Sequence, residues 1–210
     1  YEMSASLVGS EMCIRDRYCG LSRDASKEEI LERINNNTIT DILNKIEVKA
    51  GDVVMVKAGT IHAIGAGVFI CEIQQNSNCT YRMYDYDRRD KFGNPRELHV
   101  KKALDVVDNH KYIKDNKTEV VIARNEHFTE ERLVQCKYFE VYKYDVNDEA
   151  KITVDEASFV SVLFINGSGT IETDDYEKTM EFKAGDSFFV SAGLRSIIVK
   201  GRATMVVTRV

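Results

Sequence analysis

One short pattern occurs twice in the chain, and it constrains the fold more than any other feature. The first copy reads GDVVMVKAGTIH from Gly51 to His62, and the second reads GDSFFVSAGLRS from Gly185 to Ser196. Each copy begins with Gly-Asp, continues with a run of mostly apolar residues and then contains Ala-Gly. Glycine is favoured where the backbone needs a positive φ, so the glycines of each copy indicate tight turns. The repeat therefore predicts two related β structures in one chain.

Short β-branched or aromatic runs between turn residues fill much of the chain after residue 50, which is typical of strands. The expected strands are 53–56, 68–73, 80–84, 139–144, 159–165, 169–172, 188–190, 196–199 and 204–208. Helices are expected near the start, where Ser26 and Glu29 form a capping box, after Thr38, and over 97–107. Many short strands of this kind suggest a sandwich or a jelly-roll barrel.

The repeated pattern resembles the second sequence motif of the cupin family. The motif ends in a histidine that is present in the first copy as His62 and replaced in the second by Ser196. The predicted fold class is therefore mainly β, with cupin-type jelly-roll barrels, one partial and one complete, and a few short helices. The second barrel is expected to hold no metal.

Composition limits the partners of such a chain. It has 29 Lys+Arg against 34 Asp+Glu, a net charge of −5 and a pI near 5.5, and this balance argues against a general nucleic-acid binder. No apolar run reaches the ~18 residues that a membrane helix needs. Five cysteines without CxxC spacing indicate reduced thiols rather than a disulfide framework. We therefore expect a cytoplasmic protein without a nucleic-acid or membrane partner.

The N-terminal segment YEMSASLVGSEMCIRDR, residues 1–17, differs from the rest of the chain. It has no clear helix or strand period, and it lacks the basic start and apolar stretch of a signal peptide. It resembles translated adapter or vector sequence joined to a shortened reading frame. We therefore expect residues 1–17 to be foreign and to pack poorly, with an ordinary N-terminal arm as the alternative.

Two further segments carry side chains suited to chemistry. His62 lies among apolar residues at the end of the first motif copy, and imidazole binds Zn, Fe, Mn and Cu, so this residue alone does not choose a metal. Glu72 and Gln74 share one face of an expected strand by alternation. A buried acid beside an amide there could bind hydroxyls or assist proton transfer. The alternatives are a structural histidine and a polar outer face.

The densest polar and aromatic cluster is TYRMYDYDRR, residues 80–89. Alternation places Arg82 on one face of an expected strand and Asp85 on the other. A guanidinium is the planar charged fork that phosphate and enediolate oxygens need. A surface ladder of ion pairs is the alternative. His99, which follows in the next expected helix, is interpreted as a helix-surface or core residue rather than a ligand.

Three segments in order resemble one enzyme family. GDVVMVKAGTIHAIGAG, EIQQNSNCTYRMYDYDRRD and GNPRELHVKKALDV are similar to the type I mannose-6-phosphate isomerases in their short bacterial form. The resemblance implies a zinc enzyme that interconverts mannose 6-phosphate and fructose 6-phosphate through a cis-enediol, with zinc as Lewis acid and a small sugar phosphate as partner. The candidate residues are His62 for the metal, Arg82 for catalysis, and Glu72, Gln74, Asp85 and Arg88 for substrate binding.

The chain departs from this family in its metal ligands. The family has an upstream Gln-x-His segment and a later Glu, but no Gln-x-His occurs here, and Lys57 replaces the usual Pro. The resemblance thus predicts an N-terminally truncated, mostly inactive fragment with one Zn²⁺ site whose other ligands are missing. A sugar-binding cupin without catalysis is the alternative. The expected domains are 1–17, foreign; 18–125, the C-terminal part of a catalytic cupin domain with a helical insertion; and 126–210, a non-metallated barrel.

Overall fold

The computed structural model divides into two compact units, Tyr1–Asp115 and Asn116–Val210. It describes residues 2–6, 15–65, 67–76, 80–114, 120–174 and 176–210. The division lies earlier than the boundary expected between residues 125 and 126. The reason is that strand β7 (Val120–Arg124) pairs with β8 (Phe128–Gln135), so it belongs to the sheet of unit 2.

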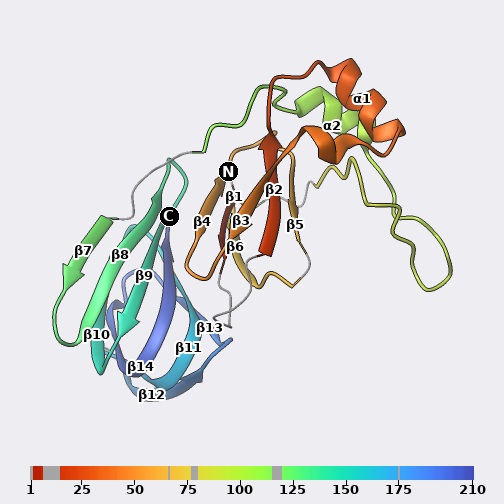
Figure 1. Ribbon diagram of the computed structural model, residues 1–210. Coiled ribbons are helices and arrows are strands. Elements are labelled where there is room, and N and C mark those ends of the chain that lie inside the picture. The colour runs from red at the N-terminus through yellow and green to blue at the C-terminus, as the bar shows by residue number, and fades with distance from the viewer. Residues whose placement is uncertain (1, 7–14, 66, 77–79, 115–119, 175) are drawn as a thin grey trace. The chain divides into compact units, whose positions relative to one another are not determined.

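Unit 1 contains two antiparallel three-stranded sheets (Figure 1). The first has the order β4 (Val53–Val56), β1 (Glu2–Ser6) and β6 (Ile70–Gln74). The second has the order β3 (Leu43–Val48), β2 (Arg15–Leu21) and β5 (His62–Ile64). Cys19 from β2 and Val54 and Val56 from β4 form one buried apolar cluster. This shared core packs the two sheets against each other.

The N-terminal segment takes part in both sheets, so the expectation of poor packing is wrong for its described residues. Glu2–Ser6 pairs with β6 on one side, and part of it pairs with β4 on the other. Arg17 in β2 pairs with Ile46 and Ile64 and is only 1% exposed. The physical reason is that strands pair through hydrogen bonds between backbone N–H and C=O groups. Every residue except proline carries both groups, so a segment can pair even where its side chains show no strand pattern. The foreign origin of residues 1–17 stays a prediction.

Helix α1 (Lys27–Asn35) begins at the predicted cap, because the Ser26 side chain accepts a hydrogen bond from the Glu29 backbone N–H. The Glu29 carboxylate, expected to reach back to the cap, instead forms ion pairs with Arg23 and Arg33. Buried Ile30 and Ile34 belong to a larger apolar cluster. This cluster also receives residues from the 3₁₀ helix η1 (Ile39–Ile42) and from α2 (Val100–Val106). Among the described helices, none has the length and apolar character to cross a membrane.

Unit 2 contains one antiparallel sheet system built around two long strands (Figure 1). The main path has the order β12, β11, β14, β9, β8 and β7, while β10 pairs with β14 and β13 pairs with β11. The bounds are β9 (Glu140–Val146), β10 (Glu149–Val154), β11 (Val160–Thr173), β12 (Tyr176–Lys183), β13 (Ser187–Val190) and β14 (Arg195–Arg209).

The long strands β11 and β14 correct the sequence analysis, which split each of them into two strands. The first half of β11 pairs with β13 and the second with β12, while β14 pairs first with β10 and then with β9. Glycines at the crossing make this possible. A Cβ on Gly167 would lie 2.0 Å from the carbonyl oxygen of Arg202, so only glycine allows the two backbones to approach there. The glycines thus mark a close approach inside the strands, not a turn between them.

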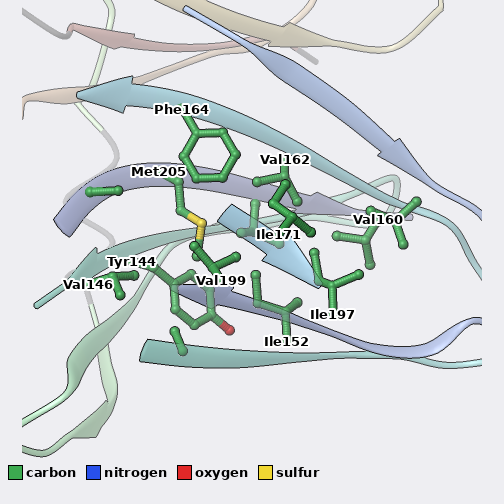
Figure 2. Close-up of a cluster of buried hydrophobic side chains, with 14 of the residues drawn as sticks. Tyr144, Val146, Ile152, Val160, Val162, Phe164, Ile171, Ile197, Val199 and Met205 are labelled. Carbon is green, nitrogen blue, oxygen red and sulfur yellow. The ribbon is translucent and has the colours of Figure 1, made fainter. Parts of the chain in front are cut away.

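Apolar side chains fill the interior of unit 2 (Figure 2). Phe164 and Phe182 stack with ring centroids 3.7 Å apart, and Phe164 and Ile197 are 0% and 1% exposed. Burial at this level supplies ~25 cal/mol for each Å² of apolar surface removed from water. The expected fold class, mainly β with cupin-type barrels and few helices, is confirmed.

The repeated motif forms the same turn in both units. Gly51 and Gly185 have φ of 89° and 92°, as the predicted turns require. In unit 1 the Lys49 backbone N–H donates to the Asp52 carboxylate at 2.9 Å, and in unit 2 the Lys183 N–H donates to Asp186 at the same distance. The prediction of two related β structures is therefore supported at the level of individual hydrogen bonds.

Candidate functional site

The His62 side chain is exposed at the start of β5, beside the turn that ends the first motif copy. Its Nδ1 lies 3.0 Å from the carbonyl oxygen of Thr60. When the protonated Nδ1 donates to this carbonyl, Nε2 becomes the nitrogen with the lone pair that a metal ion needs. The preceding Gly59 has a positive φ, and its carbonyl accepts from the Asp108 N–H at 2.9 Å just beyond α2. The turn that carries His62 is therefore fixed against the helical part of unit 1.

Glu72 and Gln74 lie on the same face of β6, and both are exposed. The alternation predicted for them is correct, but the expectation of a buried acid is wrong. The reason is that the opposite face carries the apolar residues: Cys71 is 7% exposed. Burial raises the pKa of the Cys71 thiol, and the Glu72 carboxylate beside it raises that pKa further. β6 and β5 also belong to different sheets, so Glu72 and His62 are not on paired strands.

Arg82 lies in an extended segment, residues 80–85, that pairs with no strand in the described part of the chain, so the strand predicted over 80–84 is wrong. Its backbone groups bond to the residue before α2 instead. The Arg82 N–H donates to Nδ1 of His99 at 3.3 Å, and the His99 N–H donates to the Arg82 carbonyl at 2.6 Å. The Arg82 guanidinium donates to the carbonyl of Glu97 at 3.3 Å. His99 thus holds the backbone of Arg82, which agrees with its predicted structural role.

Asp85 is 6% exposed, and two arginines occupy its carboxylate. Arg96 donates from Nε at 2.9 Å to one oxygen and from Nη2 at 2.8 Å to the other, a bidentate arrangement. Arg88 donates to the same carboxylate at 2.5 Å. These bonds, led by those of Arg96, hold the pKa of Asp85 well below its ordinary value. In the structure these bonds from Asp85 close the base of the loop 86–95, and the substrate-binding role of Asp85 stays a prediction.

The sequence analysis gave no role to the tyrosines around this segment. Tyr84 and Tyr86 have ring centroids 4.9 Å apart. Tyr18 and Tyr84 both pack against the apolar cluster around Ile30. Burial raises the pKa of Tyr86, and Tyr18 and Tyr84 raise it further. Tyr18 pairs directly with Ala63, the residue after His62. The positions of Tyr81, Tyr84 and Tyr86 in the sequence gave no signal of this contact, because it depends on the tertiary approach of β2.

One apolar cluster connects the His62 and Arg82 segments. Ile61, the residue before His62, and Met83, the residue after Arg82, both pack into the cluster that contains Ile30 of α1. The structure therefore brings the two sequence-predicted segments to the same helical side of unit 1.

The described residues do not by themselves fit a catalytic zinc. Such a site usually has three protein ligands and one open position. Across the part of the chain that the structure describes, no group of three or more His, Cys, Asp or Glu side chains is arranged to hold a metal ion. His62 offers one imidazole, and a zinc ion there would need ligands from elsewhere.

The residue of unit 2 that is equivalent to His62 is buried. Ser196, in the place of His62, is 2% exposed, and its hydroxyl donates to the Asp174 carboxylate. This bond, with Lys151 near the same carboxylate, lowers the pKa of Asp174. Ile152 and Ile197 pack in the adjoining core (Figure 2). A serine held in this way offers no imidazole, so unit 2 has the cupin framework without the motif's metal ligand.

The fold and the site residues together define a two-part, cupin-type β protein. Residues 129–210 match the family model described as mannose-6-phosphate isomerase, cupin domain. The chain is 40% identical over 190 residues to YvyI of Bacillus subtilis (strain 168), covering 88% of this chain and 57% of that protein. The crystal structure of the Bacillus subtilis mannose 6-phosphate isomerase has a TM-score of 0.88 and 34% identity, covering 100% of this chain and 64% of that one.

A more distant structure shares the fold. The mannose 6-phosphate isomerase of Salmonella typhimurium, solved with fructose 6-phosphate and zinc, has a TM-score of 0.66 and 12% identity over 99% of this chain and 65% of that one. Residues 129–210 thus match the cupin domain of mannose-6-phosphate isomerases, and a longer stretch of the chain is similar to proteins of that name. The chain spans little more than half the length of the curated relatives that it matches.

Proposed function

We propose that the protein containing this chain interconverts mannose 6-phosphate and fructose 6-phosphate. The observation that carries the proposal is the meeting of the His62 and Arg82 segments on one apolar cluster of unit 1. Support comes from the relatives, whose names give this activity, and from the Salmonella enzyme, whose structure holds fructose 6-phosphate and zinc. The substrate is a small sugar phosphate.

The reaction moves a proton between C1 and C2 of the sugar, and negative charge develops on the two oxygens of a cis-enediolate. Arg82 is the proposed catalytic cation, because a guanidinium fixed in place stabilises that charge without reorganising. Its backbone bonds to His99 hold it at the edge of the loop that Asp85 closes. Arg88, which is 63% exposed, and the exposed Glu72 and Gln74 remain the proposed contacts to substrate hydroxyls and phosphate.

Zinc, when bound, would polarise the sugar oxygens as a Lewis acid. We assign His62 to it as one ligand, through Nε2, and the remaining ligands to residues outside the described set. The 210-residue chain alone is therefore expected to bind zinc weakly and to isomerise slowly. Stoichiometric zinc together with turnover at the rate of a full-length relative would contradict this assignment.

The test uses a longer version of the enzyme, extended to the full length of the curated relatives. His62→Ala should lose zinc and activity together, because it removes a ligand. Arg82→Ala should keep zinc and lose turnover by ~100-fold, the scale of one lost oxyanion-type donor. Arg89→Ala is the matched control, because Arg89 lies in the same loop and pairs only with Asp87 among the ion pairs described. Normal turnover of Arg82→Ala would refute the catalytic role.

A sugar-binding cupin without catalysis is the second candidate. It is favoured by the single imidazole and the lack of a three-ligand group among the residues described. Zinc analysis and a mannose 6-phosphate turnover assay on the longer protein separate the two. Tight sugar-phosphate binding without zinc or turnover would favour the binding protein.

A further inference from the structure

A pocket of about 350 Å³ is lined only by residues of unit 2, and none of the residues assigned above lines it. It is bordered by the hairpin between β8 and β9, the turn between β10 and β11, and the end of β14. The residues that matter for its chemistry are Lys137, Glu140, Asp155, Ser158, Phe159 and Arg209. Its volume is near the lower end of the ~300–1,000 Å³ of small-molecule sites, so it suits a small ligand.

Arg209 is the central cation of this pocket. Its guanidinium carbon lies 5.3 Å from the centre of the Tyr142 ring, a cation–π contact that fixes the side chain. Its Nε is buried without a hydrogen-bond acceptor in the structure. Among the described residues, no carboxylate forms an ion pair with Arg209. Burying a charged donor without an acceptor is costly, and Arg209 also lines the pocket, so an anion in the pocket would offset the charge of its guanidinium.

Lys137 supplies a second positive charge. Its ammonium lies 5.6 Å from the centre of the Tyr138 ring, and the ion pairs of the described residues do not include it. Lys137 and Tyr138 are the two tip residues of a tight hairpin, closed by the Cys136 N–H donating to the Phe139 carbonyl at 3.0 Å. The hairpin places the ammonium at the rim on a short, constrained backbone.

The two acidic side chains that line the pocket, Glu140 and Asp155, are engaged by neutral donors. Glu140 accepts from the Tyr142 hydroxyl at 2.6 Å and from the Gln135 amide. Asp155 accepts from the backbone N–H groups of Ala157 and Ser158 at 2.9 and 3.1 Å. Both carboxylates therefore form hydrogen bonds within the pocket walls. Among the described ion pairs, neither carboxylate pairs with Arg209 or Lys137.

We propose that this pocket is a second anion site, which binds a small molecule bearing a phosphate monoester. A guanidinium and an ammonium on separate elements suit a doubly charged tetrahedral anion, since a fork and a point charge can approach different oxygens. Phe159, stacked on Phe189 at 4.8 Å, gives an apolar wall for the organic part of the ligand. The site is independent of the proposed isomerase site, because all its residues belong to unit 2.

The experiment titrates inorganic phosphate into the 210-residue chain at constant ionic strength and follows backbone amide signals by NMR. Saturable shifts are expected at Tyr138, Ala157 and Ser158. Arg209→Gln and Lys137→Gln should each weaken the affinity by about tenfold, the loss of one charge-assisted hydrogen bond. Arg202→Gln is the matched control, because Arg202 is exposed on the same strand outside the pocket. Its affinity should stay within about twofold of the original, since a distant exposed charge contributes little.

Three outcomes would overturn the proposal. The first is the absence of saturable shifts in unit 2 of a folded chain. The second is unchanged affinity in both Arg209→Gln and Lys137→Gln. The third is an equal loss in Arg202→Gln, which would mean diffuse attraction rather than a site. Shifts confined to unit 1 also reject it, and they would bear on the isomerase site instead, so the two proposals fail separately. Mannose without phosphate should leave the unit 2 signals unshifted.

Discussion

Gly59 and Gly193 occupy the same position in the two motif copies, but their surroundings differ. Their φ values are +85° and +81°, so both backbones are left-handed. A Cβ on Gly59 would lie 2.6 Å from the carbonyl oxygen of Val106 and 3.1 Å from the nitrogen of Asp108. A Cβ on Gly193 would meet nothing within 4 Å. Replacing each glycine by alanine therefore distinguishes two costs. Both replacements impose backbone strain, and only the one at Gly59 adds steric crowding.

The replacement Gly193→Ala should cost about 1–2 kcal/mol, the penalty of a left-handed L-residue. Gly59→Ala should cost the same plus about 1–3 kcal/mol, because the two nearest atoms, the Val106 oxygen and the Asp108 nitrogen, belong to the backbone and cannot rotate away. The added methyl would also stretch the 2.9 Å bond from the Asp108 N–H to the Gly59 carbonyl. Two-unit unfolding need not be two-state, so the assay combines urea unfolding with peptide-resolved hydrogen exchange.

The expected pattern is faster exchange around residues 57–64 and 104–108 in Gly59→Ala, and a smaller change confined to unit 2 in Gly193→Ala. Gly51→Ala is a further control, because its φ is +89° and a Cβ there meets nothing within 4 Å. Its cost in free energy should equal that of Gly193→Ala, and its change in exchange should be confined to unit 1. Equal costs for Gly59→Ala and Gly193→Ala would refute the reasoning, since they would show that the crowding at Val106 has no energetic effect.

Three other perturbations test particular contacts. Hydrogen bonds from Arg23 and Arg33 lower the pKa of Glu29 from 4.5 to about 2, so its stabilisation of α1 is present above pH 4.5 and lost as the pH falls through 2. Glu29→Gln should thus lower the melting temperature at pH 7 and lower it much less at pH 2, where about half of the folded-state carboxyl is protonated. Ser196→Ala should keep the turnover of the longer enzyme and lower its melting temperature by about 2–4 °C through one lost buried hydrogen bond. Deletion of residues 1–17 should lower the melting temperature by more than ~4 °C, because it removes the central strand β1; an unchanged value would show that this pairing contributes nothing.

The sequence predicted what depends on local chemistry. The strand over 53–56 was predicted with its observed bounds, and the Ser26 cap and the positive φ of Gly51 follow from short-range rules. Strand continuity was not predictable in this way. Gly167 reads as a turn residue, but its role depends on the carbonyl of Arg202 on a strand far away in sequence. Only the tertiary approach distinguishes a glycine that ends a strand from one that lets two strands cross.

The candidate site shows the same limit. Arg82 was expected on a strand because its neighbours alternate, yet His99 replaces the partner strand with two backbone bonds. Asp85 was predicted to bind substrate, and the sequence did not predict that Arg96 holds its carboxylate with two hydrogen bonds. A carboxylate looks the same in sequence whether it binds a ligand or an arginine of its own chain. Its burial and its partners decide, and those depend on distant residues.

The two copies of the motif show where function resides in such a fold. Both copies make the same turn, with an aspartate accepting the same backbone hydrogen bond and glycines in the same left-handed conformation. The residue three positions after the second glycine differs. His62 is exposed beside the cluster that holds Arg82's neighbour, whereas Ser196 is buried and bound to Asp174. The same backbone framework can therefore carry either an exposed histidine or a buried serine at this position. The side chain at this position, together with how open its surroundings are, determines whether a unit can contribute to a metal site or only to the stability of the fold.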